Sequence, residues 1–190
     1  WMQKSERTSL ALHQTLGMLY LNELEFESFE KHQLKGLKRY PNNSEIYQEL
    51  ATFYQGVLRP REAHKLLLRL LSKQPENENL ILQVVSLEQK IGLNKQAKQR
   101  ILETLEGNVP SEKMWQFWIE LQLTQDASKD VSADLIEMLS QFPDSEWAGV
   151  KLAEIFLHDE KYAAAEKVIE KAMEKSTESA SLKILWGRLL

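Results

Sequence analysis

The sequence predicts an all-helical protein built from repeated helical hairpins, and three observations support this prediction. In residues 146–179, apolar side chains follow the spacing of one helix face, at Leu152, Ala153 and Phe156. A second stripe of the same kind follows a short polar stretch, at Tyr162, Ala165, Ile169 and Ala172. The pattern recurs every 34 residues. The composition, with 43% hydrophobic and 27% charged residues, is that of a globular chain with an extended core.

A shift of 34 residues places the whole chain on residues 146–179 without an insertion. The pair Leu152-Ala153 then falls on Leu16-Gly17, Leu50-Ala51, Val84-Val85, Trp118-Ile119 and Trp186-Gly187. We expect one domain, residues 1–190, made of five full copies and part of a sixth. The copies cover residues 10–43, 44–77, 78–111, 112–145, 146–179 and 180–190. Residues 1–9 are expected to be the tail of a preceding helix, followed by a turn with Thr8 or Ser9 as the cap.

The first two copies show which residues are expected to end one helix and begin the next. The first is expected to pair a helix over about residues 10–22 with one over about 27–39. Pro41 ends it, because proline lacks an amide hydrogen and clashes with the preceding helical turn. Asn42-Asn43-Ser44 matches a glycosylation sequon, but we interpret it as a turn with a helix cap at Asn43 or Ser44. Pro75 closes the second copy in the same way.

The later copies differ mainly in the residues that separate their two helices. Two alanines face each other in the fifth copy, at Ala153 and Ala165. The fourth copy places Ile119 opposite Val131, and two branched side chains cannot interdigitate as closely as two alanines. We therefore expect the helices of the fourth copy to lie further apart. The third copy is the most polar.

The repeat resembles the tetratricopeptide repeat (TPR) family, whose 34-residue pattern runs W-x2-L-G-x2-Y, then A-x3-F and a late proline. The residues that match are Leu16-Gly17 and Tyr20 in the first copy, Leu50-Ala51, Tyr54 and Ala63 in the second, Trp115 in the fourth, and the late prolines Pro41, Pro75 and Pro143. The resemblance implies a right-handed superhelical solenoid of antiparallel helix pairs. It also implies that the first helix of each copy lines a concave groove that binds a protein or peptide partner.

The groove positions implied by the resemblance give the candidate partner-binding residues: Gln14, Met18, Gln48, Thr52, Leu82, Ser86, Gln116, Glu120, Leu123, Trp147, Val150, Glu154, Leu157 and Ile184. The earlier part of this set is mostly polar and the later part is mostly apolar. One hypothesis is that the later part binds an apolar or amphipathic peptide, with Trp147 as the anchor and Glu120 and Glu154 favouring a basic flank. The alternative is that a following helix, or the curvature of the array, covers these residues.

Other function classes find little support in the sequence. The formal net charge of −4 argues against a surface for nucleic acid, and without cysteine there is no thiolate metal site or cysteine nucleophile. Phosphate-binding loops and metalloprotease or hydrolase motifs do not occur, and the four histidines lack metal-ligand spacing. We therefore expect no enzyme activity, cofactor or metal. No apolar run is long enough to span a membrane.

The ends of the chain suggest an alternative function. Trp186, Leu189 and Leu190 lie on a last helix that has no partner helix in the sequence, and a solenoid needs a polar cap. We favour a longer native array, of which this chain, beginning at Trp1, is a fragment or processed product. Otherwise, these residues dock on another copy of the chain, as in a structural assembly segment. A role in bacterial envelope secretion, pilus or polysaccharide export systems is open, and so is the compartment, cytoplasmic or periplasmic.

Overall fold

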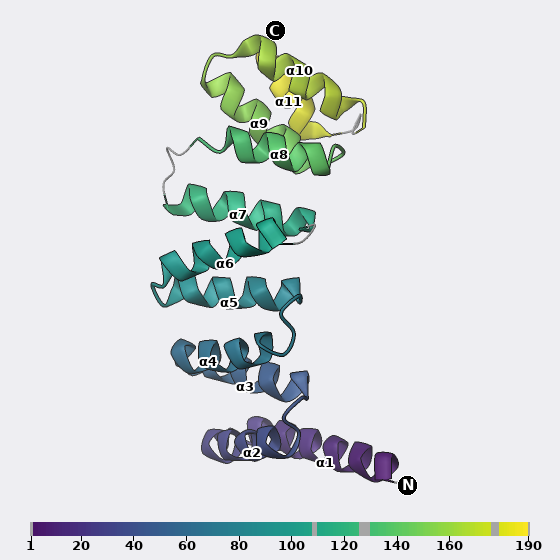
Figure 1. Ribbon diagram of the computed structural model, residues 1–190, viewed down its shortest axis with the longest axis vertical. Helices are drawn as coiled ribbons and strands as arrows, with labels where there is room; N and C mark the ends of the chain where they lie inside the picture. Colours follow the sequence, from purple (N-terminus) through teal and green to yellow (C-terminus); the bar gives the residue numbers. More distant parts are fainter. Residues whose placement is uncertain (1, 108–109, 126–129, 176–178, 190) are drawn as a thin grey trace. The chain divides into compact units, whose positions relative to one another are not determined.

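The structure is a computed structural model that describes residues 2–107, 110–125, 130–175 and 179–189. These residues form helices and no strands (Figure 1), which confirms the predicted all-helical fold class. The helices are α1 (Met2–Asn22), α2 (Phe26–Arg39), α3 (Ser44–Gly56), α4 (Pro60–Leu71), α5 (Glu78–Lys90), α6 (Asn94–Gly107), α7 (Glu112–Gln125), α8 (Ser132–Gln141), α9 (Glu146–His158), α10 (Tyr162–Met173) and α11 (Ala180–Leu189). The chain divides into two compact units, residues 1–100 and 101–190, with the boundary inside α6. Among the described residues, no helix is both long and apolar enough to cross a membrane.

The first helix of each later copy begins at the residue where the repeat pattern begins. α3, α5, α7, α9 and α11 start at Ser44, Glu78, Glu112, Glu146 and Ala180. A side-chain oxygen just before each start accepts a hydrogen bond from the amide three residues further on, at Asn43, Asn77, Ser111, Ser145 and Ser179. These caps satisfy amides that have no partner inside the helix. The interpretation of residues 42–44 as a capped turn is confirmed at Asn43. The grouping of the copies into one domain remains a prediction.

The beginning of the chain departs from this scheme. Ser9 stands 34 residues before Asn43, in the phase of a cap, and a turn was expected there. Instead, α1 continues without interruption from Met2 to Asn22. The Ser9 hydroxyl accepts a hydrogen bond from the hydroxyl of Tyr40, with the two oxygens 2.8 Å apart. The predicted turn and the cap at Thr8 or Ser9 are therefore wrong, and Ser9 links the two helices of the first copy.

The turn between the two helices of a copy has the same backbone conformation in four of the copies. Its key residue is left-handed, with φ of 59° at Leu24, 58° at Leu58, 80° at Gly92 and 58° at Glu160. Successive residues of this set are 34 or 68 positions apart. Only glycine adopts this conformation without a steric cost, so Leu24, Leu58 and Glu160 adopt a backbone conformation that their side chains disfavour. The hairpin geometry is thus imposed by the packing of the two helices.

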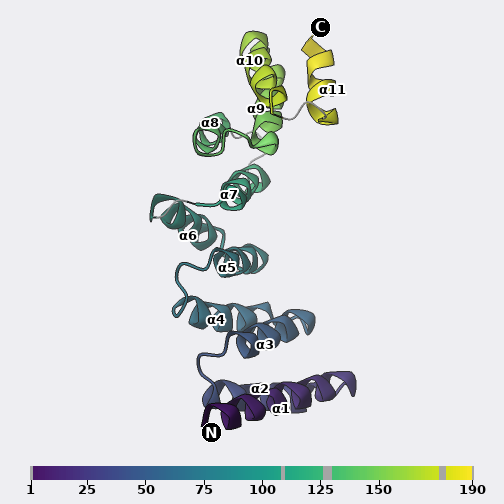
Figure 2. The same ribbon diagram turned by 90° about the vertical axis from the view of Figure 1, so that its right-hand side faces the viewer.

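In the unit of residues 101–190, the hairpins pack to different degrees. Ala153 and Ala165 are fully buried between α9 and α10, which lie close together along much of their length (Figures 1 and 2). Ile119 and Val131 are also fully buried, but α7 and α8 approach closely at fewer of the described residues. This agrees with the expectation that branched side chains hold the helices of the fourth copy apart.

Candidate partner-binding face

The first helix of each full copy has a side that solvent can reach. The ninth residue of a copy is exposed or half-buried in all five, at Met18, Thr52, Ser86, Glu120 and Glu154. The eighth residue is buried in all five, at Gly17, Ala51, Val85, Ile119 and Ala153. Successive residues of a helix point about 100° apart, because one turn takes about 3.6 residues. The eighth side chain therefore enters the core while the ninth points outward.

In the unit of residues 1–100, the candidate residues are mostly accessible and uncharged. Met18 is 61% exposed and Thr52 is exposed, while Gln14, Gln48 and Ser86 are half-buried. The Gln14 side-chain amide donates a hydrogen bond to Glu45 of the next copy. Leu82 is only 7% exposed, so it belongs to the core of this unit. This corrects the expectation that Leu82 is available to a partner.

In the other unit, the candidate residues on α7 are Gln116, Glu120 and Leu123. Glu120 is exposed, and Leu123 is half-buried. Gln116 is also half-buried, and its amide nitrogen lies 3.2 Å from a carboxylate oxygen of Glu112 one turn earlier. The accessible side of α7 thus combines an acidic group with apolar surface.

On α9 and α11 the candidate residues have two kinds of surroundings. Val150 and Leu157 pack against a core cluster that includes Leu185 of α11. For these two residues the structure favours the alternative in which a following helix covers them. Trp147 is half-buried, and Glu154 is exposed with its carboxylate 3.0 Å from Nζ of Lys151. A further candidate, Ile184 of α11, is 65% exposed.

The residues considered for self-association also have partners within the chain. Trp186 and Leu189 are half-buried and pack against the cluster of Ala153, Ile169 and Leu185. α11 therefore uses much of its apolar surface on α9 and α10. Leu190 lies outside the described residues. The structure gives no support to a docking surface made of these residues.

A polar cluster that joins the first and second copies was not anticipated from the sequence. The rings of His13 and His32 stack with their centres 3.8 Å apart. Gln33 is fully buried and bridges His13 and Glu49, with contacts of 3.1 and 2.7 Å. Burial lowers the pKa of His13 and raises the pKa of Glu49, so both groups favour their neutral forms. Among the described residues, no group of three or more His, Cys, Asp or Glu side chains could hold a metal ion.

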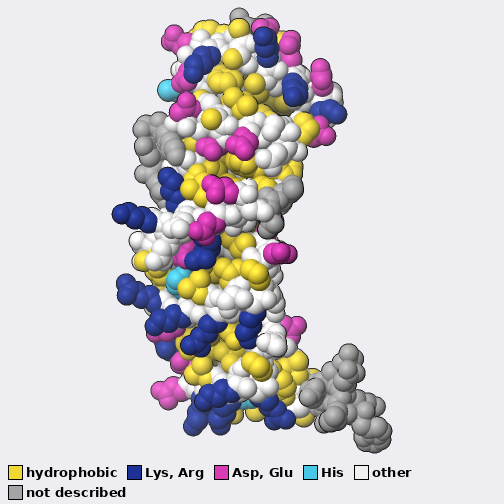
Figure 3. Space-filling model, in the orientation of Figure 1, with side chains coloured by type: hydrophobic (Ala, Val, Ile, Leu, Met, Phe, Trp, Pro, Cys, Tyr) yellow, Lys and Arg dark blue, Asp and Glu magenta, His cyan; other side chains and the backbone are white. Residues whose placement is uncertain are grey.

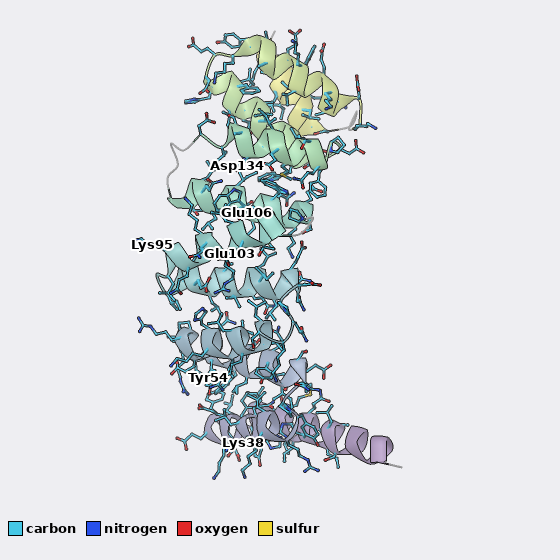
Figure 4. All side chains as sticks on the ribbon, in the orientation of Figure 1. Lys38, Tyr54, Lys95, Glu103, Glu106 and Asp134 are labelled. Carbon is cyan, nitrogen blue, oxygen red and sulfur yellow. The ribbon has the colours of Figure 1, made fainter. Side chains whose placement is uncertain are left out.

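In three copies, the side chain at the eleventh position bonds to a side chain of a second helix. The Tyr54 hydroxyl donates to Glu30 at 2.7 Å, and burial together with that carboxylate raises the pKa of Tyr54 to about 12 (Figure 4). Glu88 is fully buried, 2.8 Å from Arg100 and 3.1 Å from His64. The third residue is Gln122, which donates to Asp134 of α8 at 2.9 Å. These bonds explain how polar residues are tolerated in the core, since a buried polar group is costly without a partner.

A cavity of about 380 Å³ lies between α8 and α10, over the start of α9. Its walls include Ile136, Gly149, Val168 and Ala172. None of its lining residues is among the candidate residues. The candidates were all chosen on first helices, whereas this cavity lies mainly between two second helices.

Comparisons with known proteins identify the fold. No protein-family model matches the sequence, and no curated protein does either. Solved structures do match. PilF of Pseudomonas aeruginosa is 16% identical, with a TM-score of 0.59, over 94% of this chain and 82% of that chain. A tetratricopeptide repeat protein from Parabacteroides merdae is 20% identical, with a TM-score of 0.55, over 94% and 70%. YrrB, described as a TPR protein with an unusual peptide-binding site, is 14% identical, with a TM-score of 0.57, over 92% and 90%.

These matches show that the chain has the fold of an all-helical repeat protein. Its fold is that of a tetratricopeptide repeat array, as the 34-residue pattern indicated.

Proposed function

We propose that this chain is an interaction scaffold that binds a segment of a partner protein on the accessible side of its first helices. The observation that carries the proposal is the ninth position, which reaches solvent in every full copy while its neighbour is buried. Within each unit, a repeated position of this kind offers one side chain per copy to an extended or helical partner, and binding surfaces of repeat proteins are built in this way. The likeness to YrrB, which is described as having a peptide-binding site, supports the proposal.

The two units offer different chemistry at this position. Met18, Thr52 and Ser86 are uncharged, so the first unit suits apolar contacts and neutral hydrogen bonds. Glu120 and Glu154 are acidic in the second unit, where Ile184 adds an exposed apolar side chain. Residues 101–190 contain 17 acidic residues and 9 Lys or Arg. The second unit therefore suits a segment with an apolar anchor and basic flanks, since complementary charge adds speed and specificity to association.

Site-specific cross-linking tests the proposal. A photoreactive amino acid is placed at Thr52 or Glu154, and the matched controls place it at Lys65 of α4 or Glu166 of α10, which are exposed on second helices. We expect the ninth positions to cross-link a partner from the source cells, and we expect the controls not to cross-link it.

Two results would contradict this assignment. One is cross-linking of the partner from the second-helix controls alone. The other is a light-scattering mass that corresponds to a dimer for the unaltered chain and to a monomer for a Trp186→Glu variant, together with loss of cross-linking through Glu154 in that variant. That second result would favour a self-assembly segment.

A further inference from the structure

The cavity between α8 and α10 has the form of a half-open apolar groove. Ile136 and Leu139 of α8 form one wall, Val168 and Ala172 of α10 form the other, and Gly149 of α9 contributes to the floor. Ile136 is 53% exposed, and hydrophobic side chains reach the surface in this part of the molecule (Figure 3). The volume of about 380 Å³ falls within the usual range of ligand sites, roughly 300–1,000 Å³.

The groove exists because two small residues meet where other copies have a bulky one. Gly149 is the fourth residue of the fifth copy and Ala172 is the twenty-seventh. A Cβ added to Gly149 would lie 3.1 Å from the Cβ of Ala172, so the two positions face each other. The same pair is His13 and Gly36 in the first copy, Tyr47 and Leu70 in the second, and Trp115 and Met138 in the fourth. In the first copy, the ring of His13 fills the space beside Gly36.

Buried bulky side chains occupy the pair in the second and fourth copies, where each of the four residues is at most 6% exposed. The fifth copy alone among these four lacks the side chain that would close the gap between neighbouring second helices. The missing group is a large apolar or aromatic one, because that is what the equivalent positions hold. A partner side chain of this kind fits the space.

The charges around the groove indicate the rest of the partner. Lys167 and Lys171 of α10, and Lys175 just after the end of that helix, line the groove. On the other side, Asp144 is 3.6 Å from Lys175, and Glu146 accepts a hydrogen bond from Ser179 at 2.5 Å. The acidic groups therefore have partners within the chain. No acidic side chain among the described residues lies within ion-pair distance of Lys167 or Lys171.

We propose that this groove is a second docking site, which takes an acidic amphipathic helix of a partner protein. The helix inserts a bulky apolar side chain over Gly149 and Ala172 and directs carboxylates toward Lys167 and Lys171. A groove between two helices suits a third helix, whose apolar face supplies anchors at positions three and four residues apart. The three lysines stand out in a unit whose sequence is strongly acidic. This site is separate from the first-helix face, so either can exist without the other.

The test uses a phage-displayed library of helical 16-residue peptides. The library is selected on the whole chain and depleted on an Ala172→Leu variant, which gives the fifth copy the leucine that the second copy has at Leu70. Circular dichroism and thermal melting establish that the variant is folded. We expect the enriched peptides to combine Trp, Phe or Leu anchors with a net negative charge.

Two charge-reversal variants then test the lysines with a selected peptide in fluorescence anisotropy. The first is Lys167→Glu with Lys171→Glu. The matched control is Lys65→Glu with Arg69→Glu, which changes the same repeat positions of the second copy. We expect the first variant to weaken binding by at least about tenfold and the control by less than about twofold.

Three outcomes would overturn the proposal. Enriched peptides without an acidic bias would remove the charge argument. Peptides that bind the Ala172→Leu variant equally well, or no peptide enriched above that variant, would show that the groove takes no helix. A dimer of the chain that Ala172→Leu dissociates would show that a second copy occupies the groove.

Discussion

The α7–α8 and α9–α10 hairpins are consecutive copies of one pattern in the same compact unit, but their helices are held together differently. Between α9 and α10, the facing residues Ala153 and Ala165 allow close backbone approach. Between α7 and α8, the branched residues Ile119 and Val131 take these places and the helices approach less closely.

Side-chain hydrogen bonds span the wider pair of helices. The indole nitrogen of Trp118 and the amide nitrogen of Gln122 both donate to Asp134 of α8, at 3.1 and 2.9 Å (Figure 4). The indole nitrogen of Trp115 lies 3.3 Å from the side-chain oxygen of Gln141. The comparison teaches that one repeat pattern can hold two helices either by close apolar contact or by larger side chains with polar bridges.

The largest effect is expected from Ile119→Ala, which removes the spacer of the wider hairpin. Ile119 is fully buried, so the loss leaves a cavity between α7 and α8. We expect the free energy of unfolding to fall by about 2–5 kcal/mol. Urea unfolding measures it, with Ile136→Ala on the exposed side of α8 as the control, which we expect to cost about 0.5 kcal/mol or less. An equal loss in both variants would mean that Ile119 does not separate the helices.

The reverse change, Ala153→Ile, forces the spacer of the fourth copy into the closely packed fifth. Ala153 is fully buried beside α10 and has no room for three more carbon atoms. Overpacking of this kind costs about 1–3 kcal/mol. The same urea measurement applies, and Ala163→Ile at an exposed position of α10 is the control. If Ala153→Ile were as stable as the unaltered chain, close contact would not be what holds α9 and α10 together.

A smaller effect is expected from Asp134→Asn, which tests the polar bridge. The substitution replaces one acceptor oxygen by a donor that faces Trp118 or Gln122. We expect a loss of about 1–2 kcal/mol, because both donors lie in largely buried residues and bond to a charged group. Asp144→Asn is the control, since the Asp144–Lys175 pair is exposed and contributes about 0–1 kcal/mol. Losses that do not differ would argue against the bridge.

The smallest effect concerns the turn between α9 and α10. The ammonium of Lys161, 2.9 Å away, and the ring of His158 lower the pKa of Asp159 below its ordinary value of 3.8. Because the folded-state pKa is lowered, the stabilisation is present above the unfolded value and is lost as the pH falls through the folded value. Carboxyl NMR titration should show the low pKa, and Lys161→Met should raise it. An unchanged titration in that variant would assign the shift to other groups.

Much of the fold could be predicted from the sequence, because the same pattern of apolar and capping residues occurs in several copies. The starts of α3, α5, α7, α9 and α11 follow from the 34-residue phase, and the cap at Asn43 from local turn chemistry. The 34-residue phase gave a wrong prediction at Ser9, where a helix start was expected. Residues 2–9 contain no glycine or proline that would stop a helix. A capping residue inside a continuous helix can bond elsewhere, as Ser9 does with Tyr40.

The candidate site was less predictable, because accessibility depends on neighbouring copies. Leu82 shares its repeat position with Gln14 and Gln48, which are half-buried, but Leu82 itself is in the core. The groove beside Gly149 also has a counterpart in the sequence, namely two small residues at a pair of positions that holds at least one bulky residue in every other full copy. That pattern becomes readable only once the structure shows that the two positions face each other.

The loose contact between α7 and α8 also has a consequence for how the chain opens. α8 approaches α9 over more residues than it approaches α7, although α7 is its partner in the repeat. Backbone amides of α8 should therefore exchange their hydrogens with solvent together with those of α9 and α10, and α7 should exchange separately. The segment that opens and closes cooperatively would then begin at α8, the second helix of a copy, and not at the first helix, where the sequence repeat begins.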